Sequence, residues 1–114
     1  MLPCARAEIR YYVDANDRAP FADWVRALDD FAAFRVAGAL KRMAEGNFSN
    51  AKGVGKGVLE FRIDFGPGYR IYFGRDGDAI VVLLTGGTKD RQQRDILAAQ
   101  ALWLDYKQTK RSQH

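Results

Sequence analysis

The stretch EFRIDFGPGYRIYFGRDGDAIVVLLTGGTK, Glu60–Lys89, decides the fold, because apolar and polar residues alternate along most of it. Such alternation is typical of half-buried strands. It predicts three consecutive strands, over about Val58–Phe65, Tyr69–Arg75 and Ala79–Thr85, with Gly66-Pro67-Gly68 as the first turn. The third strand is apolar on both sides, which favours a central place in the sheet.

The apolar residues of the first two strands predict how these strands pair. Both apolar sets reach the same core if Ile63 lies opposite Ile71. Arg62 then lies opposite Tyr72 on the other face, and Arg70 becomes a diagonal neighbour of Arg62. A slip of two residues would keep the faces and change the partners.

The rest of the chain predicts one more strand and three helices. The strand covers Ala7–Val13. A first helix begins at Pro20, whose fixed φ suits the first turn, and a second helix follows Asp29-Asp30 and ends at Gly46-Asn47. The last helix covers about Asp90–Lys107, with DRQQ at its start resembling a capping box.

The order β-α-α-β-β-β-α predicts an α+β domain with an antiparallel sheet core, an N-terminal helical hairpin and a C-terminal helix. Residues 1–114 are expected to form a single domain, in which about 108–114 are a flexible tail and 49–56 a loop. The second helix is expected to bury Phe31, Phe34, Ala37, Leu40 and Ala44, and the last helix Ile96, Ala99, Trp103 and Tyr106. Trp24 is also expected in the core.

Composition narrows the class of protein. The 114 residues are 47% hydrophobic and 28% charged, as in ordinary soluble domains, and no run approaches the roughly 18 apolar residues of a membrane span. The start MLPCARAEIRYY lacks the apolar region of a signal peptide, so a cytoplasmic protein is expected. One cysteine, Cys4, and one histidine, His114, offer neither an internal disulfide nor a structural zinc site, and no metal or cofactor is expected.

Cations on the predicted sheet suggest an anionic partner. The net charge is +4, and Arg62, Arg70 and Lys89 are expected to converge on one concave face beside the start of the last helix. Two interpretations stay open at this point. The arginines could form ordinary cross-strand ion pairs with Glu60 or Asp64, each contributing about 0–1 kcal/mol, or they could bind a ligand.

The segments LEFRIDFGPGYRIYFGRDGDAIVVLLTGGTKDRQQRDILAAQALW and PFADWVRALDD resemble the RelE/ParE superfamily of bacterial toxins, which belong to type II toxin–antitoxin modules. The resemblance covers nearly the whole chain and is greatest to the phage-derived addiction-module killer-protein branch. It implies a RelE-like fold and one of two activities. RelE-like members cleave mRNA, usually in the ribosomal A site, whereas ParE-like members poison DNA gyrase. A shared fold does not decide between these activities.

The resemblance implies site residues for the ribonuclease activity. Arg70 in GYR, Arg62 in EFR and Lys89 in GGTK match basic positions of RelE-like nucleases. The C-terminal tyrosine of some members has no match, and Tyr72 is its proposed substitute. Glu60 is a candidate base. The further RNA-binding candidates are Lys52, Lys56 and Arg91.

The chemistry of RNA cleavage fits these residue types. The 2′-hydroxyl of RNA can itself attack the phosphate without a metal ion. Arginines then stabilise the dianionic transition state, and a lysine among cations can serve as acid or base. The ribosome is expected to orient the mRNA, as it does for ribosome-dependent members of the family.

The resemblance also implies partners. The expected inhibitor is a cognate antitoxin protein of the helix-turn-helix type, and operator DNA is expected to be bound only through the complex of both proteins. A basic face suits an acidic antitoxin segment. The helical hairpin at 20–46 and the last helix are alternative docking surfaces. No membrane is involved in either activity.

Overall fold

A computed structural model describes residues 6–112 of the 114-residue chain. Cys4 and His114, which the sequence analysis considered, lie outside the described residues. Between residues 6 and 112, none of the helices combines the length and the apolar character that crossing a membrane requires.

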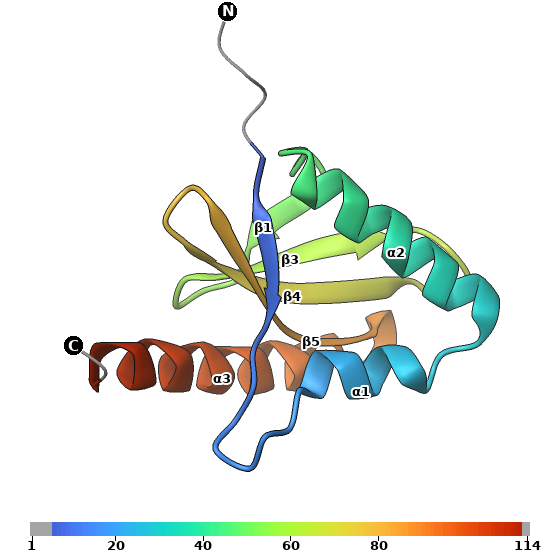
Figure 1. Ribbon diagram of the computed structural model, residues 1–114. Coiled ribbons are helices and arrows are strands. Elements are labelled where there is room, and N and C mark those ends of the chain that lie inside the picture. Colours follow the sequence, from blue (N-terminus) through green and yellow to red (C-terminus); the bar gives the residue numbers. More distant parts are fainter. Residues whose placement is uncertain (1–5, 113–114) are drawn as a thin grey trace, which may run out of the picture.

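Five strands form one sheet in the order β1-β5-β4-β3-β2 (Figure 1). The three strands predicted from the central stretch are β3 (Val58–Ile63), β4 (Tyr69–Asp76) and β5 (Ile80–Thr88), which pair antiparallel. At one edge β2 (Ala51–Gly53) pairs antiparallel with β3, and at the other β1 (Glu8–Tyr11) runs parallel to β5. The prediction of an α+β fold is confirmed in this form, a five-stranded mixed sheet with a C-terminal helix.

The predicted order of elements is wrong, and the antiparallel strands β2 to β5 are joined at one edge by a parallel strand, which makes the sheet mixed. The observed order is β-α-α-β-β-β-β-α, because residues predicted as a loop contain the three-residue strand β2. A strand this short lacks the alternation that marks a strand in sequence. The direction of β1 was also missed, since alternation shows that a segment is extended but not which way its neighbour runs.

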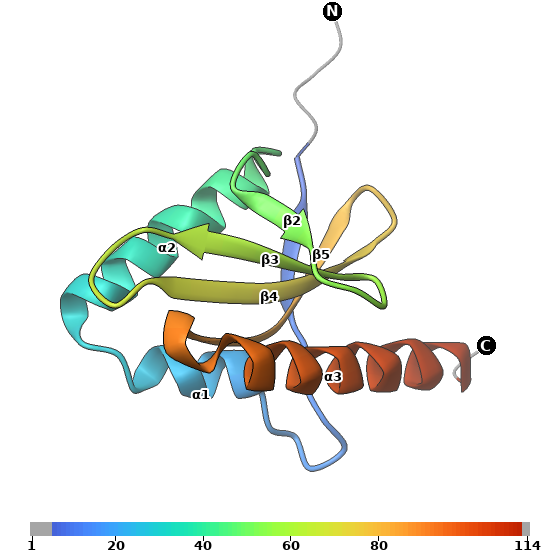
Figure 2. The same cartoon turned by 180° about the vertical axis from the view of Figure 1, so that it is seen from behind.

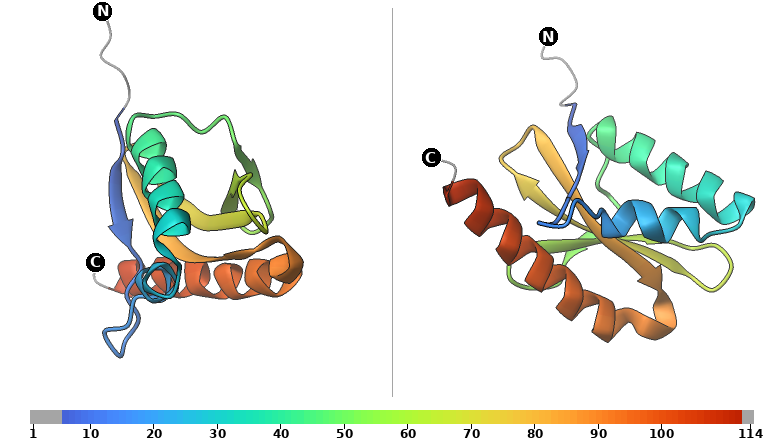
Figure 3. Two further views of the ribbon diagram at one scale, coloured as in Figure 1. Left: turned by 90° about the vertical axis from the view of Figure 1, so that its right-hand side faces the viewer. Right: turned by 60° about the horizontal axis from the view of Figure 1, so that its bottom comes forward.

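The helices cover both faces of the sheet. On one face lie α1 (Pro20–Arg26) and α2 (Asp30–Ala44), and the Asp29 side chain caps α2 by accepting a 2.8 Å hydrogen bond from the backbone N–H of Ala32. The other face carries α3 (Gln92–Ser112), as the view from behind shows (Figure 2). In the right-hand view of Figure 3 the twisted sheet lies between α2 and α3.

The buried face of α2 differs from the prediction. Phe31 and Phe34 are each 77% exposed, and the buried residues of the helix are Ala32, Val36, Ala39 and Met43. A spacing of three and four residues fits more than one face of the same helix. Small residues at Ala32 and Ala39 face the sheet, which lets the helix backbone approach it closely.

Two hydrophobic clusters lie on either side of the sheet. The first joins α1 and α2 to one face, through residues such as Phe21, Phe61 and Phe73. The second joins α3 to the opposite face, through residues such as Val82 and Trp103. The predicted burial of Trp103 and Ala99 is confirmed, and Trp24 is half-buried against the first cluster.

The last helix begins and ends later than predicted. Residues Lys89–Arg91 form a 3-10 turn, so α3 begins at Gln92 rather than Asp90, and it continues to Ser112. The part of the expected flexible tail at 108–112 is therefore helical. Lys110 makes an ion pair with Asp76 of β4, which ties this last part of the helix to the sheet.

The pairing of β3 with β4 is shifted by two residues from the predicted register. Ile63 lies opposite Tyr69, and Arg62 lies directly opposite Arg70. Five residues rather than three connect the strands, and the backbone N–H of Gly68 donates to the carbonyl of Phe65 at 3.0 Å inside this turn. Gly68 has a φ of 81°, which other residues adopt only with strain. The faces stay as predicted, but the partners change.

Candidate functional site

Two arginines and a glycine form a row across three neighbouring strands. Arg62 on β3 lies opposite Arg70 on β4, and Arg70 lies opposite Gly87 on β5. Residues that are directly opposite share a face, so both arginine side chains are on the face that α3 covers. A Cβ added to Gly87 would overlap the carboxylate of Asp95 from α3. The Asp95 carboxylate thus lies over the third position of this row. We call Arg62, Arg70 and Asp95 the arginine row.

A buried carboxylate lies in the next row of the sheet. Glu60 has no exposed surface, and its Oε2 accepts hydrogen bonds from the Tyr72 hydroxyl at 3.0 Å and from Gln92 Nε2 at 2.8 Å. Its Oε1 lies 3.8 Å from Arg70 Nε and 3.9 Å from Lys52 Nζ. Burial and the charge of Glu60 raise the pKa of Tyr72, so this hydroxyl stays protonated as a donor.

This buried network is only partly paired. Within residues 6–112, Glu60 Oε1 and Arg70 Nε are buried and have no hydrogen-bond partner, because 3.8 Å is too long for a hydrogen bond between them. The Arg70 side chain is only 7% exposed. Unpaired buried polar groups are costly and few in native structures, and a chemical role or a bound ion is one explanation for them.

Lys89 reaches the same region through the turn between β3 and β4. Its backbone N–H donates to the Gly68 carbonyl at 2.8 Å. A Cβ added to Gly68 would lie 3.4 Å from Lys89 Cβ and 3.9 Å from Arg70 Nη1. The structure therefore brings together Arg62, Arg70 and Lys89, the three cations that the sequence analysis singled out.

The remaining predicted residues lie in different places. Lys52 is exposed except for its contact with Glu60, so it borders the buried network. Lys56 has a φ of 57° in the turn between β2 and β3 and lines a surface groove beside the middle of α3. It belongs to the opposite end of β3 from Arg62, roughly 20 Å along the strand. Arg91 lines a separate cleft, described next.

A cleft of about 360 Å³ lies where β5 extends beyond its partner β1. We call it the edge cleft; it is lined by Trp24, Thr85, Gly86, Gly87, Thr88, Arg91 and Asp95. The ring of Trp24 packs on Gly86 from the α1 side, and Asp95 packs on Gly87 from the α3 side. Absence of side chains at these two glycines allows both close approaches.

Asp95 and Gln92 are site residues that the sequence analysis missed. Burial raises the pKa of Asp95, although the charges of Arg91 and Arg94 oppose this shift. Asp95 Oδ2 is buried without a hydrogen-bond partner among the described residues. A signal was present in the sequence, since Gln92 and Asp95 continue the spacing of the predicted inner stripe that contains Ala99 and Trp103.

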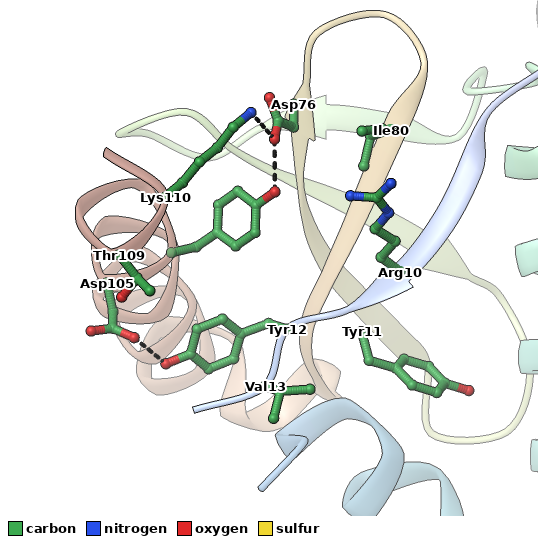
Figure 4. A pocket seen from close by; sticks show the side chains of 10 residues that line it. Arg10, Tyr11, Tyr12, Val13, Asp76, Ile80, Asp105, Thr109 and Lys110 are labelled. Atoms are coloured by element: carbon green, nitrogen blue, oxygen red, sulfur yellow. Dashed lines mark hydrogen bonds and ion pairs between the residues drawn. The ribbon is translucent and has the colours of Figure 1, made fainter. Parts of the chain in front are cut away.

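The opposite end of α3 has a second cleft of about 370 Å³, beside β1 and the hairpin of β4 and β5 (Figure 4). The Tyr106 hydroxyl donates to Asp76 at 2.7 Å, Lys110 contacts the same oxygen, and the Tyr12 hydroxyl donates to Asp105. Burial and Asp76 raise the pKa of Tyr106 to about 12. Each of these groups has a partner, so this cleft is a set of structural ties between α3 and the sheet.

Comparison with known proteins identifies a relative. No known family model matches the chain. An uncharacterized protein of Haemophilus influenzae is 39% identical over 83 residues, which are 72% of this chain and 84% of the relative. The two proteins belong to one family. The relative's description carries no activity, so functional conclusions depend on the geometry of the site.

Proposed function

We propose that this protein is the toxin of a type II toxin–antitoxin module and acts as a metal-independent, ribosome-dependent mRNA endoribonuclease. The observation that carries the proposal is the direct opposition of Arg62 and Arg70, with Lys89 beside them. Like charges directly opposite in a sheet repel each other. A phosphate between them reverses this, because each guanidinium can donate two hydrogen bonds to its oxygens.

The cations take different roles in the proposed reaction. Arg62 is exposed and Arg70 is nearly buried. Together they can bind a phosphate, Arg62 from the solvent side and Arg70 from the side of the sheet. Their charge stabilises the transition state, in which the phosphate gains negative charge. The exposed amine of Lys89 can protonate the leaving 5′-oxygen. Lys52 and Arg91 extend the cationic surface for the neighbouring nucleotides.

In this proposal Glu60 and Tyr72 do not contact the RNA but help to hold Arg70 in place. Both are fully buried, so neither contacts an RNA strand bound at the surface. Instead Tyr72 and Gln92 hold the Glu60 carboxylate, whose charge lies beside Arg70 and keeps the guanidinium on the site face. The roles that the sequence analysis gave to Glu60 and Tyr72, as base and as substitute tyrosine, are thereby revised.

Such a toxin requires an inhibitor. We propose a cognate antitoxin with an acidic segment that covers the arginine row, because the row is cationic and the whole chain carries a net charge of +4. Operator DNA would be bound only by the complex of toxin and antitoxin.

Induction of the gene in a bacterial host, followed by mapping of new mRNA 5′ ends, tests the proposal. The wild-type protein should produce cuts at fixed positions within codons, and these cuts should disappear when translation is blocked. Arg70→Ala and Arg62→Ala should each lower cleavage by about 10² or more, in line with the loss of a transition-state donor. Arg26→Ala is the matched control, since Arg26 is exposed on α1 and pairs with Asp23.

The burial of Glu60 and Tyr72 favours a second candidate. Among the residues that the sequence analysis assigned to catalysis, the two acid–base groups other than Lys89 are inaccessible. A ParE-like inhibitor of DNA gyrase needs no catalytic group, and the arginine row would then be its docking surface. Growth arrest with intact mRNA, filamentation and double-strand DNA breaks would favour this candidate and reject the nuclease.

A further inference from the structure

The edge cleft places a carboxylate at the end of the arginine row. We propose that Asp95 is the general base of the proposed nuclease and accepts the proton of the attacking 2′-hydroxyl. This inference depends on the proposed function and adds to it the proton acceptor that neither Glu60 nor Tyr72 can supply from their buried positions.

The position of Asp95 is set by the missing side chain of Gly87. The carboxylate occupies the space that a Cβ of Gly87 would take, directly across from Arg70. It is thus at the third position of the row, one strand from Arg70 and two strands from Arg62. In RNA the 2′-hydroxyl is adjacent to the scissile phosphate, so a base must lie near the phosphate donors, and Asp95 is at the Arg70 end of the row.

Asp95 can meet a ligand through the edge cleft, which it lines as a half-buried residue. Its Oδ2 packs against Gly87 and is buried without a hydrogen-bond partner within residues 6–112, so no protein donor holds that oxygen. Glu60 differs, since two donors already bind its Oε2 and it has no exposed surface. The edge cleft also contains the half-buried ring of Trp24, an aromatic wall of the kind on which unstacked RNA bases pack.

Electrostatics tune this carboxylate toward proton transfer. Burial raises the pKa of Asp95, and a base whose pKa approaches the working pH is a more effective proton acceptor. Charged and titratable groups of three elements surround Asp95. Asp90 and Arg91 belong to the preceding turn, Arg94 to the same helix, and Tyr72 and Arg70 to β4. The charges of Arg91 and Arg94 oppose the effect of burial and lower the pKa of Asp95, whereas Asp90 raises it further.

The proposed step is balanced in bonds and protons. The 2′-hydroxyl gives its proton to the Asp95 carboxylate, and its oxygen forms a bond to phosphorus. The bond from phosphorus to the 5′-oxygen of the next nucleotide breaks, and Lys89 protonates that oxygen. The products are a 2′,3′-cyclic phosphate and a 5′-hydroxyl end. Solvent then takes the proton from Asp95 and returns one to Lys89.

Single-turnover cleavage of mRNA on purified ribosomes, measured across pH, tests this role. Asp95→Asn should cleave about 10² to 10⁴ more slowly, the usual range for loss of a general base, with unchanged affinity for ribosomes carrying mRNA that is 2′-deoxy at the cut. The wild-type rate should rise with pH to a plateau, and Asp95→Asn should lose this rise. Asp95→Glu should recover at least tenfold of the rate, because it restores a carboxylate. Asp64→Asn, an equal change of charge at an exposed site, should keep the wild-type rate.

The outcomes separate this inference from the proposed function. Cleavage by wild type with loss in Arg70→Ala, but a wild-type rate and pH profile in Asp95→Asn, would overturn the role of Asp95 and leave the nuclease in place. Equal losses of rate and affinity in Asp95→Asn would also overturn it, since Asp95 would then be a structural or binding group. Absence of cleavage by the wild-type protein on ribosomes would reject the nuclease itself.

Discussion

The two ends of α3 contact the same face of the sheet in different ways. At its C-terminal end Tyr106 and Lys110 pair with Asp76 of β4, and Asp105 pairs with Tyr12, the residue after β1. At its N-terminal end Gln92 pairs with Glu60, but Asp95 Oδ2, like Arg70 Nε on the sheet below, has no partner among the described residues.

This difference distinguishes an end of the helix that is held by paired side chains from an end where the proposed site lies. Paired polar groups and buried apolar surface hold the C-terminal end, so its interactions are accounted for by the fold. The buried atoms at the N-terminal end that lack a hydrogen-bond partner cost stability. A bound ligand is one explanation for such a cost, and three changes test the comparison.

The largest effect is expected from Trp103→Ala. Trp103 is 6% exposed, stacks on Tyr106 at a ring distance of 5.1 Å, and packs against Gly74 so closely that a Cβ there would lie 2.5 Å from its ring. Its loss should lower the free energy of unfolding by about 3–5 kcal/mol, measured by urea denaturation. Leu104→Ala, at a residue 53% exposed, is the control and should change it by less than about 0.5 kcal/mol. A loss below about 1 kcal/mol in Trp103→Ala would show that this end of α3 is not the anchor.

A smaller effect is expected from Tyr72→Phe, compared with Tyr106→Phe at the other end. Tyr72 donates to a carboxylate without exposed surface, so its removal should cost about 1.5–3 kcal/mol in free energy of unfolding. Tyr106 donates to Asp76, which also contacts Lys110, and its removal should cost about 1 kcal/mol. Denaturation of both variants in one buffer measures the difference. The reverse order would mean that the buried network contributes less than the exposed ties.

The smallest effect is a pH dependence of opposite sign at the two ends. Hydrogen bonds from Lys110 and Tyr106 lower the pKa of Asp76, so its contribution to stability is present above the ordinary aspartate pKa and is lost as pH falls through the lowered value. Burial raises the pKa of Asp95, so protonation of this group stabilises the folded state as pH falls through the raised value.

Urea denaturation between pH 7 and 2 measures both contributions. Asp76→Asn should reduce the loss of stability below about pH 4, and Asp95→Asn should remove a gain that begins above that pH. Each change should be below about 1 kcal/mol, because both groups are partly exposed. A change of the same sign in the two variants would contradict the comparison.

Local patterns explain which parts of the fold were predictable. The three central strands, the two-helix segment and the C-terminal helix follow from alternation, helical spacing and Pro20, all of which depend on neighbours in sequence. The parallel pairing of β1 and the short strand β2 depend on partners far along the chain. Phe34 was assigned to the core because one helix can present two apolar faces, and only packing decides between them.

The cations of the candidate site could be predicted from the sequence, but the burial of its residues could not. Alternation places Arg62 and Arg70 on one face, yet it does not show that α3 covers that face. The burial of Glu60, Tyr72 and Arg70 depends on this cover, as does the position of Asp95. The register shift had a local cause, since the turn between β3 and β4 spans five residues instead of three.

The pairing of β1 with β5 has a consequence for how the protein is made. Glu8–Tyr11 pairs with Ile80–Leu83, so this edge of the sheet closes only after residues 8–83 have left the ribosome. Pairing across such a long loop is entropically costly and slow to form. Asp95 and α3 are synthesised later still. A chain that is still being synthesised therefore lacks the complete candidate site until its last helix has emerged. Under the proposed function, this order protects the ribosome that makes the protein.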